Sequence, residues 1–270
     1  MLEALLWDVD GTLAESERDG HRVAFNQAFR SMGLDWYWDI THYGQLLRTT
    51  GGRERILADM ASRADAPAGA TERDALAREL HGRKNASYAQ LVREGAVPLR
   101  EGVRELIDEA ASAGLRQGIA TTTSRENVDA LLGQHFGKGW AHIFALVVCG
   151  EDVVAKKPDP EVYRLVLRGL GIGAQLALAL EDSPAGVAAA LAAEVPVVLT
   201  RSAYFTDEPA AGAIAAGPGL HRRAGWRPAF AASASGWPPV DARDPAPEGG
   251  GLVTLRDLRG WHARAQAPTR

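Results

Sequence analysis

The chain has almost no cysteine: Cys149 is the only one among its 270 residues. A single cysteine excludes a disulfide within the chain. Cys149 lies in the apolar run IFALVVCG, and we therefore interpret it as a buried structural thiol and not as a nucleophile. A chain without disulfides fits a reducing compartment, and we expect a cytoplasmic protein.

The chain also lacks long apolar runs and an excess of positive charge. No stretch reaches the roughly 18 apolar residues of a membrane span, and the N-terminal apolar stretch, which contains Glu3 and Asp8, is too short for a signal peptide. The formal net charge is -4, without the concentrated basic segment that attracts nucleic acid. We expect no membrane partner and no nucleic-acid partner. Any phosphate group that the protein binds must therefore be held by a few residues at one local site.

What the chain does contain is an alternation of short apolar runs with helical patterns. The apolar runs lack helical periodicity and indicate buried strands at residues 3–10, 115–121, 143–150, 176–181 and 195–200. Helical patterns lie between them, for example at 101–114 and 160–171. This alternation is typical of right-handed crossovers and predicts an α/β fold, a doubly wound parallel sheet with helices on both faces.

Two segments depart from the alternation. Residues 15–96 show helical patterns and no convincing strand, which predicts an all-helical insertion above the carboxyl ends of the strands, where it can act as a lid. Residues 207–250 are rich in Ala, Gly, Pro and Arg, and we assign no elements to them. A short edge strand and a terminal helix are expected after them. The predicted catalytic core therefore consists of residues 1–14, 97–206 and 251–270.

The motif DVDG follows the first apolar run and places Asp8 and Asp10 one residue apart. Side chains alternate along a strand, so both carboxylates are expected on one face. Two carboxylates at about 4 Å repel by roughly 4 kcal/mol at an effective dielectric of 20, so the pair needs a cation, a shared proton or strong donors. Mg²⁺ prefers such oxygen ligands. A solvated Asx turn remains the alternative for this motif taken alone.

Polar residues also follow the later strands. Hydroxyl groups follow the second core strand at Thr121, Thr122 and Thr123, immediately before a helix, where they and the backbone N–H groups can meet an anion. Lys156 and Lys157 precede a proline that restricts the backbone. Because the carboxyl ends of parallel strands meet in one crevice, we expect a Mg²⁺ site, an anion cradle and a carboxylate nucleophile to lie together there.

A second acidic pair, Glu181 and Asp182, follows a later strand and repeats the design of the first motif. Ser183 and Pro184 come directly after it, as N-cap and first helical turn. Read alone, this would be a capped helix with solvated acids. Together with the other strand ends it completes a set of acids, hydroxyls, a lysine and further acids in chain order, which predicts phosphoryl transfer.

On these residues the sequence resembles the haloacid dehalogenase superfamily of phosphotransferases: DVDGT, Thr121, Lys157 and the ED pair at 181 and 182 match its four motifs. The helical insertion resembles the C1 cap of the subgroup that contains phosphoglycolate phosphatases and β-phosphoglucomutases. Several further stretches resemble the CbbY-like set, sugar bisphosphate phosphatases associated with carbon fixation that act on xylulose-1,5-bisphosphate. They are DVDGTLAESERDGHRVAFN, GLDWYWD, TTGGRERI, LHGRKNASY, IATTTSREN, KKPDPEVY and EDSPAG.

The resemblance implies roles for these residues. Asp8 would attack phosphorus, and Asp10 would protonate the leaving alkoxide and later activate water. Mg²⁺ would be held by Asp8, the Asp10 carbonyl and Asp182, with Glu181 supporting the metal shell. Thr121 and Lys157 would bind the transferring phosphoryl group. The same division of work follows from the chemistry, because a metal-bound carboxylate is a poor base, whereas its neighbour off the metal can carry a proton.

A small phosphorylated sugar is the expected partner, and a bisphosphate needs a second anion site. We expect substrate contacts in the insertion and at the second core strand, from Glu17, His21, Gly51, Gly52, Arg53, Lys84, Thr122 and Thr123. Arg53 and Lys84 supply the charge, and the two glycines permit close backbone approach. For four further histidines, we expect only surface or packing roles, namely His42, His81, His135 and His221.

Several alternatives stay open at this point. A phosphoglycolate phosphatase or a β-phosphoglucomutase-like mutase would use the same motifs, and a receiver-like phospho-switch would use a similar Asp, Thr and Lys set without turnover. The insertion and the DxD spacing disfavour the switch. Asp10 disfavours a metal-independent dehalogenase, which needs no second aspartate. For the oligomeric state we expect a monomer or a weak homodimer.

Overall fold

The structure is a computed structural model and describes residues 1–228 and 250–266. Its centre is a seven-stranded sheet in the order β3-β2-β1-β4-β5-β6-β7, in which only the β6–β7 pair is antiparallel. The strands are β1 (Ala4–Trp7), β2 (Arg116–Ala120), β3 (Leu146–Val148), β4 (Ala177–Glu181), β5 (Val197–Thr200), β6 (Ala215–Gly217) and β7 (Arg227–Pro228). The predicted doubly wound parallel sheet is confirmed.

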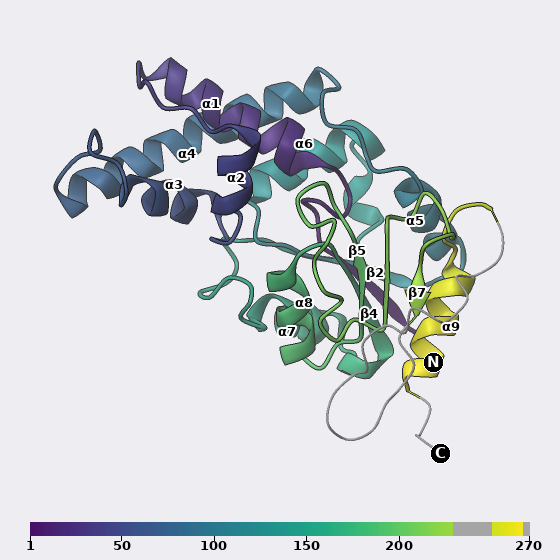
Figure 1. The fold of residues 1–270 in the computed structure, drawn as a ribbon. Coiled ribbons are helices and arrows are strands. Elements are labelled where there is room, and N and C mark those ends of the chain that lie inside the picture. The colour runs from purple at the N-terminus through teal and green to yellow at the C-terminus, as the bar shows by residue number, and fades with distance from the viewer. Residues whose placement is uncertain (229–249, 267–270) are drawn as a thin grey trace.

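Helices cover both faces of the sheet, as Figure 1 shows. One face packs in a single apolar cluster against α5 (Val103–Ser112), α6 (Arg125–Phe136) and α9 (Leu255–Ala265). The other face packs against α7 (Glu161–Leu170) and α8 (Pro184–Ala192). β1 and β4 are buried along their whole lengths, which explains why they read as unbroken apolar runs.

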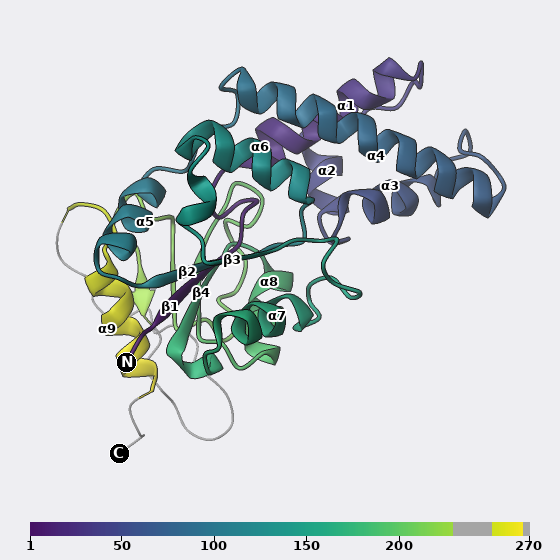
Figure 2. The same ribbon diagram turned by 180° about the vertical axis from the view of Figure 1, so that it is seen from behind.

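The insertion after β1 is helical throughout, as expected, and has an apolar core of its own. It contains a π-helical turn η1 (Glu17–His21), α1 (Arg22–Ser31), α2 (Ile40–Leu46), α3 (Gly52–Met60) and α4 (Ala70–Arg93). Aromatic side chains fill its centre, with the Phe25 and Trp38 ring centroids 4.6 Å apart. The insertion lies beyond the carboxyl ends of the strands, and α4 packs along α6 of the core (Figure 2). We refer to it as the cap.

Three predictions of local structure need correction. Two short strands, β6 and β7, form within the segment to which we assigned no elements, because Gly217 leaves room for the buried Trp226 indole and β6 pairs with β5. The expected edge strand after residue 250 does not form, and the chain enters α9 directly through the Thr254 cap. The seven-residue α2 was not anticipated. Residues 229–249 of the irregular segment lie outside the described residues.

No helix in the described part of the chain is both long and apolar enough to span a membrane. Two short 3-10 turns, η2 (Trp140–His142) and η3 (Ala174–Leu176), complete the described elements. Cys149 is buried, and burial raises the pKa of its thiol to about 12, which agrees with a structural role.

Candidate active site

The first motif begins immediately after β1. The Asp8 N–H continues the sheet by donating to the Leu180 carbonyl at 3.1 Å, and the chain then turns at Gly11, which has a φ of 82°. A Cβ atom at Gly11 would lie 2.0 Å from Asp182 Oδ2. Glycine at this position therefore lets the motif turn approach the acidic pair that follows β4.

Lys157 joins the acids at the bottom of the site. Its Nζ atom donates to Asp8 Oδ1 at 2.6 Å, to Glu181 Oε1 at 2.6 Å and to the Ala120 carbonyl at 2.8 Å. Tyr163 also donates to Glu181, at 2.6 Å. The charged side chains of Asp8, Lys157 and Glu181 are almost completely buried. Their positions are therefore set by their hydrogen bonds to one another and not by contacts with solvent.

The carboxylates of Asp8, Glu181 and Asp182 each offer an oxygen within 4.8 Å of the others. Burial raises the pKa of Asp8 to about 8, against the opposing charge of Lys157. Burial and the nearby charges of Asp8 and Glu181 likewise hold the pKa of Asp182 well above its usual range. One lysine neutralises three acids incompletely, and this oxygen-rich set fits a divalent cation such as Mg²⁺.

Asp10 has a different environment from Asp8. Its Oδ1 accepts hydrogen bonds from Ser16 Oγ at 2.5 Å and lies 2.9 Å from His21 Nε2. Burial alone would raise the pKa of Asp10, but the charge and hydrogen bond of His21, the hydrogen bond from Ser16 and the charge of Lys84 hold it below its usual range. The two aspartates thus line one cavity while having separate partners.

The hydroxyl group at the end of β2 lies in the same crevice. The Thr121 N–H donates to the Val148 carbonyl at 3.1 Å, which extends the β2–β3 pairing, and the side chain is buried. Thr123 Oγ1 accepts from Asn127 Nδ2 at 3.1 Å. Ser124 is the N-cap residue of α6, and its buried Oγ has no hydrogen-bond partner among the described residues. These groups leave N–H and O–H donors for an anion at the start of α6.

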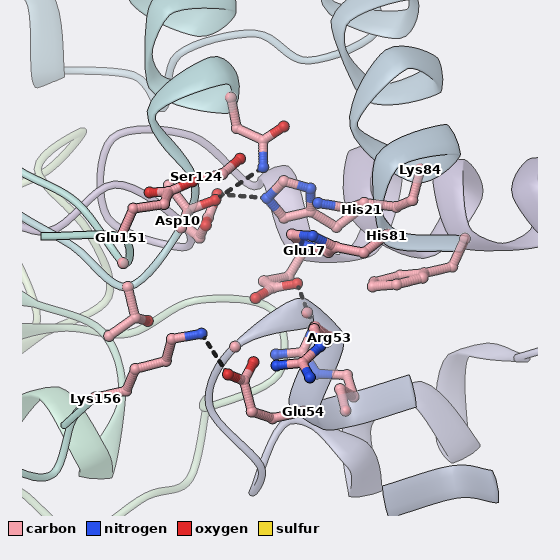
Figure 3. Close-up of a pocket in the computed structure, with 18 residues that line it drawn as sticks. Asp10, Glu17, His21, Arg53, Glu54, His81, Lys84, Ser124, Glu151 and Lys156 are labelled. Atoms are coloured by element: carbon pink, nitrogen blue, oxygen red, sulfur yellow. Dashed lines mark hydrogen bonds and ion pairs between the residues drawn. The ribbon is translucent and has the colours of Figure 1, made fainter. Parts of the chain in front are cut away.

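Two connected chambers lie between the cap and the core. The larger, about 640 Å³, is lined by Asp8, Asp10, Thr121, Lys157 and Asp182 on the core side. The smaller, about 200 Å³, is drawn in Figure 3. It is lined by cationic or polar groups of the cap and, on the core side, by Asp10, by residues at the start of α6 and by Lys156. Both chambers are lined by Asp10, Glu17, Gly51, Arg55 and Thr122, so they form one continuous site.

Every residue that we predicted to contact substrate lines these chambers, although some of these side chains already have partners within the protein. Gly51 and Gly52 form the start of α3. Arg53 lines the smaller chamber but forms an ion pair with Asp74. Lys84 is buried, and within residues 1–228 and 250–266 its one hydrogen bond is long, 3.4 Å to Asn85 Oδ1. Burial lowers the pKa of its ammonium group to about 8.

Sequence reasoning missed several residues of the cap side. Arg55 is buried and donates to the Tyr43 hydroxyl at 2.6 Å, and Tyr43 in turn donates to Glu17. Arg55 lies two positions after Arg53, and its buried guanidinium gave no signal in the helical pattern.

His81, for which we expected only a packing or surface role, lines the smaller chamber. Burial and the charges of Lys84 and Lys156 lower its pKa to about 4. Its spacing of three residues from Lys84 on α4 was a usable signal, because such residues share a helix face.

The chain is similar to known proteins both in sequence and in structure. Residues 2–194 match the family model of the haloacid dehalogenase-like hydrolases. Protein CbbY of Rhodobacter capsulatus is 48% identical over 203 residues, which are 75% of this chain and 87% of that protein. Protein CbbY of Cupriavidus necator is 41% identical over 219 residues, 81% of this chain and 86% of that protein.

A solved structure also matches. It is a mutant of CbbY from Rhodobacter sphaeroides in complex with xylulose-(1,5)bisphosphate, with a TM-score of 0.74 and 42% sequence identity. The match covers 79% of this chain and 92% of that chain.

Proposed function

This chain belongs to the haloacid dehalogenase-like hydrolase family and is a phosphatase related to CbbY, and from that premise we propose that it hydrolyses a small sugar bisphosphate, xylulose-1,5-bisphosphate. The observation that carries the proposal is the pair of connected chambers. One contains the acids and Lys157, and the other contains cations from the cap. A substrate with a phosphate group at each end would place one group in each chamber.

In the proposed first step, an oxygen of Asp8 attacks phosphorus and the ester P–O bond breaks. Lys157 holds the Asp8 carboxylate in position, and Thr121 donates to the transferring phosphoryl group. The leaving alkoxide takes a proton from Asp10. His21 and Ser16 hold Asp10 ionised in this structure. The arriving phosphate adds a like charge that raises the pKa of Asp10, so Asp10 takes up a proton from solvent as the substrate binds and later gives it to the alkoxide.

In the second step, Asp10 is again ionised and accepts a proton from water, which attacks the phosphorus of the aspartyl phosphate. The Asp8–phosphorus bond breaks, inorganic phosphate leaves and Asp8 is restored. Dividing a very slow hydrolysis into two steps is the advantage of a covalent intermediate. Mg²⁺ bound by Asp8, Asp182 and the Asp10 carbonyl would stabilise the negative charge that develops on the phosphoryl oxygens. Glu181 would hold Lys157 beside this cluster.

The test is phosphate release by the purified enzyme from xylulose-1,5-bisphosphate, 2-phosphoglycolate and β-glucose 1-phosphate, with Mg²⁺ and with EDTA. We expect kcat/KM for the bisphosphate to exceed that for either monophosphate at least about tenfold, because the second phosphate adds one charged contact set worth about 1.4 kcal/mol or more. EDTA should abolish release. Preference for phosphoglycolate would contradict the substrate, and isomerised sugar phosphate without inorganic phosphate would indicate a mutase. No release from any substrate would favour a phospho-switch.

A further inference from the structure

The cap and the core are joined at the loop that carries Lys157. Glu54, in the first turn of α3, accepts a hydrogen bond from Lys156 Nζ at 2.8 Å. Thr50, just before α3, donates from Oγ1 to the Lys157 carbonyl at 2.7 Å. Figure 3 shows the Lys156 side chain reaching across to Glu54 at the edge of the smaller chamber. Two residues of the cap therefore hold the two consecutive lysines of the core.

The contact is closely packed over the glycine loop. A Cβ atom at Gly51 would lie 2.2 Å from Glu54 Oε2 and 2.6 Å from Lys156 Nζ, and the Gly51 φ of 91° disfavours any other residue. Burial would raise the pKa of Glu54, but the hydrogen bond from Lys156 and the charges of Lys156 and Arg53 lower it. The Glu54 carboxylate is thus ionised at neutral pH and faces the Lys156 side chain.

We propose that Thr50, Glu54 and Lys156 form a latch that holds the cap closed over the core, and that the latch favours substrates bound at both ends. This inference rests on the proposed function. A bisphosphate engages core and cap together, so its transition state needs the closed arrangement. A small monoester bound only by the core side gains nothing from closure.

The latch makes Glu54 and Lys156 positioning residues, which act through the placement of the cap over the core. A competing role would have Lys156 bind the distal phosphate directly, since it also lines the smaller chamber. The two roles predict opposite effects of Glu54→Gln on KM for the bisphosphate. Removing the Glu54 charge weakens a latch, whereas it frees Lys156 to bind an anion.

The test compares Glu54→Gln and Lys156→Gln with Glu79→Gln, a matched control that removes one side of an exposed pair with Arg83 on α4. For xylulose-1,5-bisphosphate we expect KM to rise and kcat/KM to fall about fivefold in each latch variant. Hydrolysis of p-nitrophenyl phosphate should stay within about twofold, and the control should match the native enzyme on both substrates. The charge exchange Glu54→Lys with Lys156→Glu should restore part of the lost kcat/KM.

A lower KM for the bisphosphate in Glu54→Gln would overturn the latch and make Lys156 a ligand. Equal losses on both substrates would also overturn it, because they indicate a merely structural pair. Amide hydrogen exchange supplies a readout that needs no substrate: residues 50–55 should exchange faster in both latch variants than in the control. Unchanged exchange contradicts the latch, whereas a native enzyme inactive on the bisphosphate contradicts the proposed function.

Discussion

The core side and the cap side of the site differ in how their charges are held. On the core side, Lys157 donates to three acceptors within 2.8 Å, and Glu181 accepts from Lys157 and Tyr163 at 2.6 Å each; these side chains are buried. On the cap side, Lys84 has one long hydrogen bond and His21 Nδ1 has no partner among the described residues. The contacts of Lys157 and Glu181 are complete before substrate arrives, whereas Lys84 and His21 keep hydrogen-bonding capacity for the substrate to use. Catalysis should therefore depend on the core, and substrate choice on the cap.

Among the substitutions considered, Asp8→Asn on the core side should have the largest effect on catalysis. The amide keeps the size of the side chain but is no nucleophile, so kcat should fall by at least about 10⁴-fold on every phosphate ester. Steady-state phosphate release measures it. Asp19→Asn is a suitable control, because Asp19 is an exposed partner of Arg18 and should leave kcat unchanged. Residual turnover above about 1% of native would exclude Asp8 as the nucleophile.

Lys157→Met should have the next largest effect. It leaves the buried Asp8 and Glu181 without their shared cation, so the free energy of unfolding should fall by about 3–5 kcal/mol. Loss of one charge donor at the phosphoryl group should lower kcat by about 10²–10³-fold. Urea unfolding and phosphate release measure the two effects.

Lys156→Met serves as the matched control for stability. It removes the neighbouring lysine from a partly exposed pair, and it should cost less than about 1 kcal/mol of unfolding free energy. Equal destabilisation by the two substitutions would contradict the difference that we draw between the buried and the exposed ion pairs.

The two sides also differ in how far the sequence predicts them. Apolar runs mark where β1, β2 and β4 end, and parallel strands bring those ends together, so the placement of Asp8, Thr121 and Asp182 could be predicted. The helices of the cap could be predicted as elements, but not the way their faces pack. The chain from Arg55 through Tyr43 to Glu17 joins α3, α2 and η1, and no periodicity within one helix encodes it.

The same limit applies to β6, whose sequence Ala-Ala-Gly carries no strand propensity. Its extended form depends on pairing with β5 and on the Trp226 indole, which lies against Gly217. Both partners are distant in sequence or become recognisable only in the packed structure. Local pattern therefore predicts the buried parallel core and fails where tertiary contacts override propensity.

The smallest expected effect is the pH dependence of substrate binding, which tests the charge that Lys84 supplies on the cap side. Burial holds the pKa of Lys84 at about 8, so the free enzyme loses this charge as pH rises through 8. KM for the bisphosphate should then rise by up to about tenfold between about pH 7 and pH 9. KM for p-nitrophenyl phosphate should not follow this curve, because only the distal phosphate needs the cap. Lys84→Arg should remove the rise, since arginine stays charged throughout. The same rise in Lys84→Arg would assign the titration to another group and end the argument that Lys84 supplies this charge.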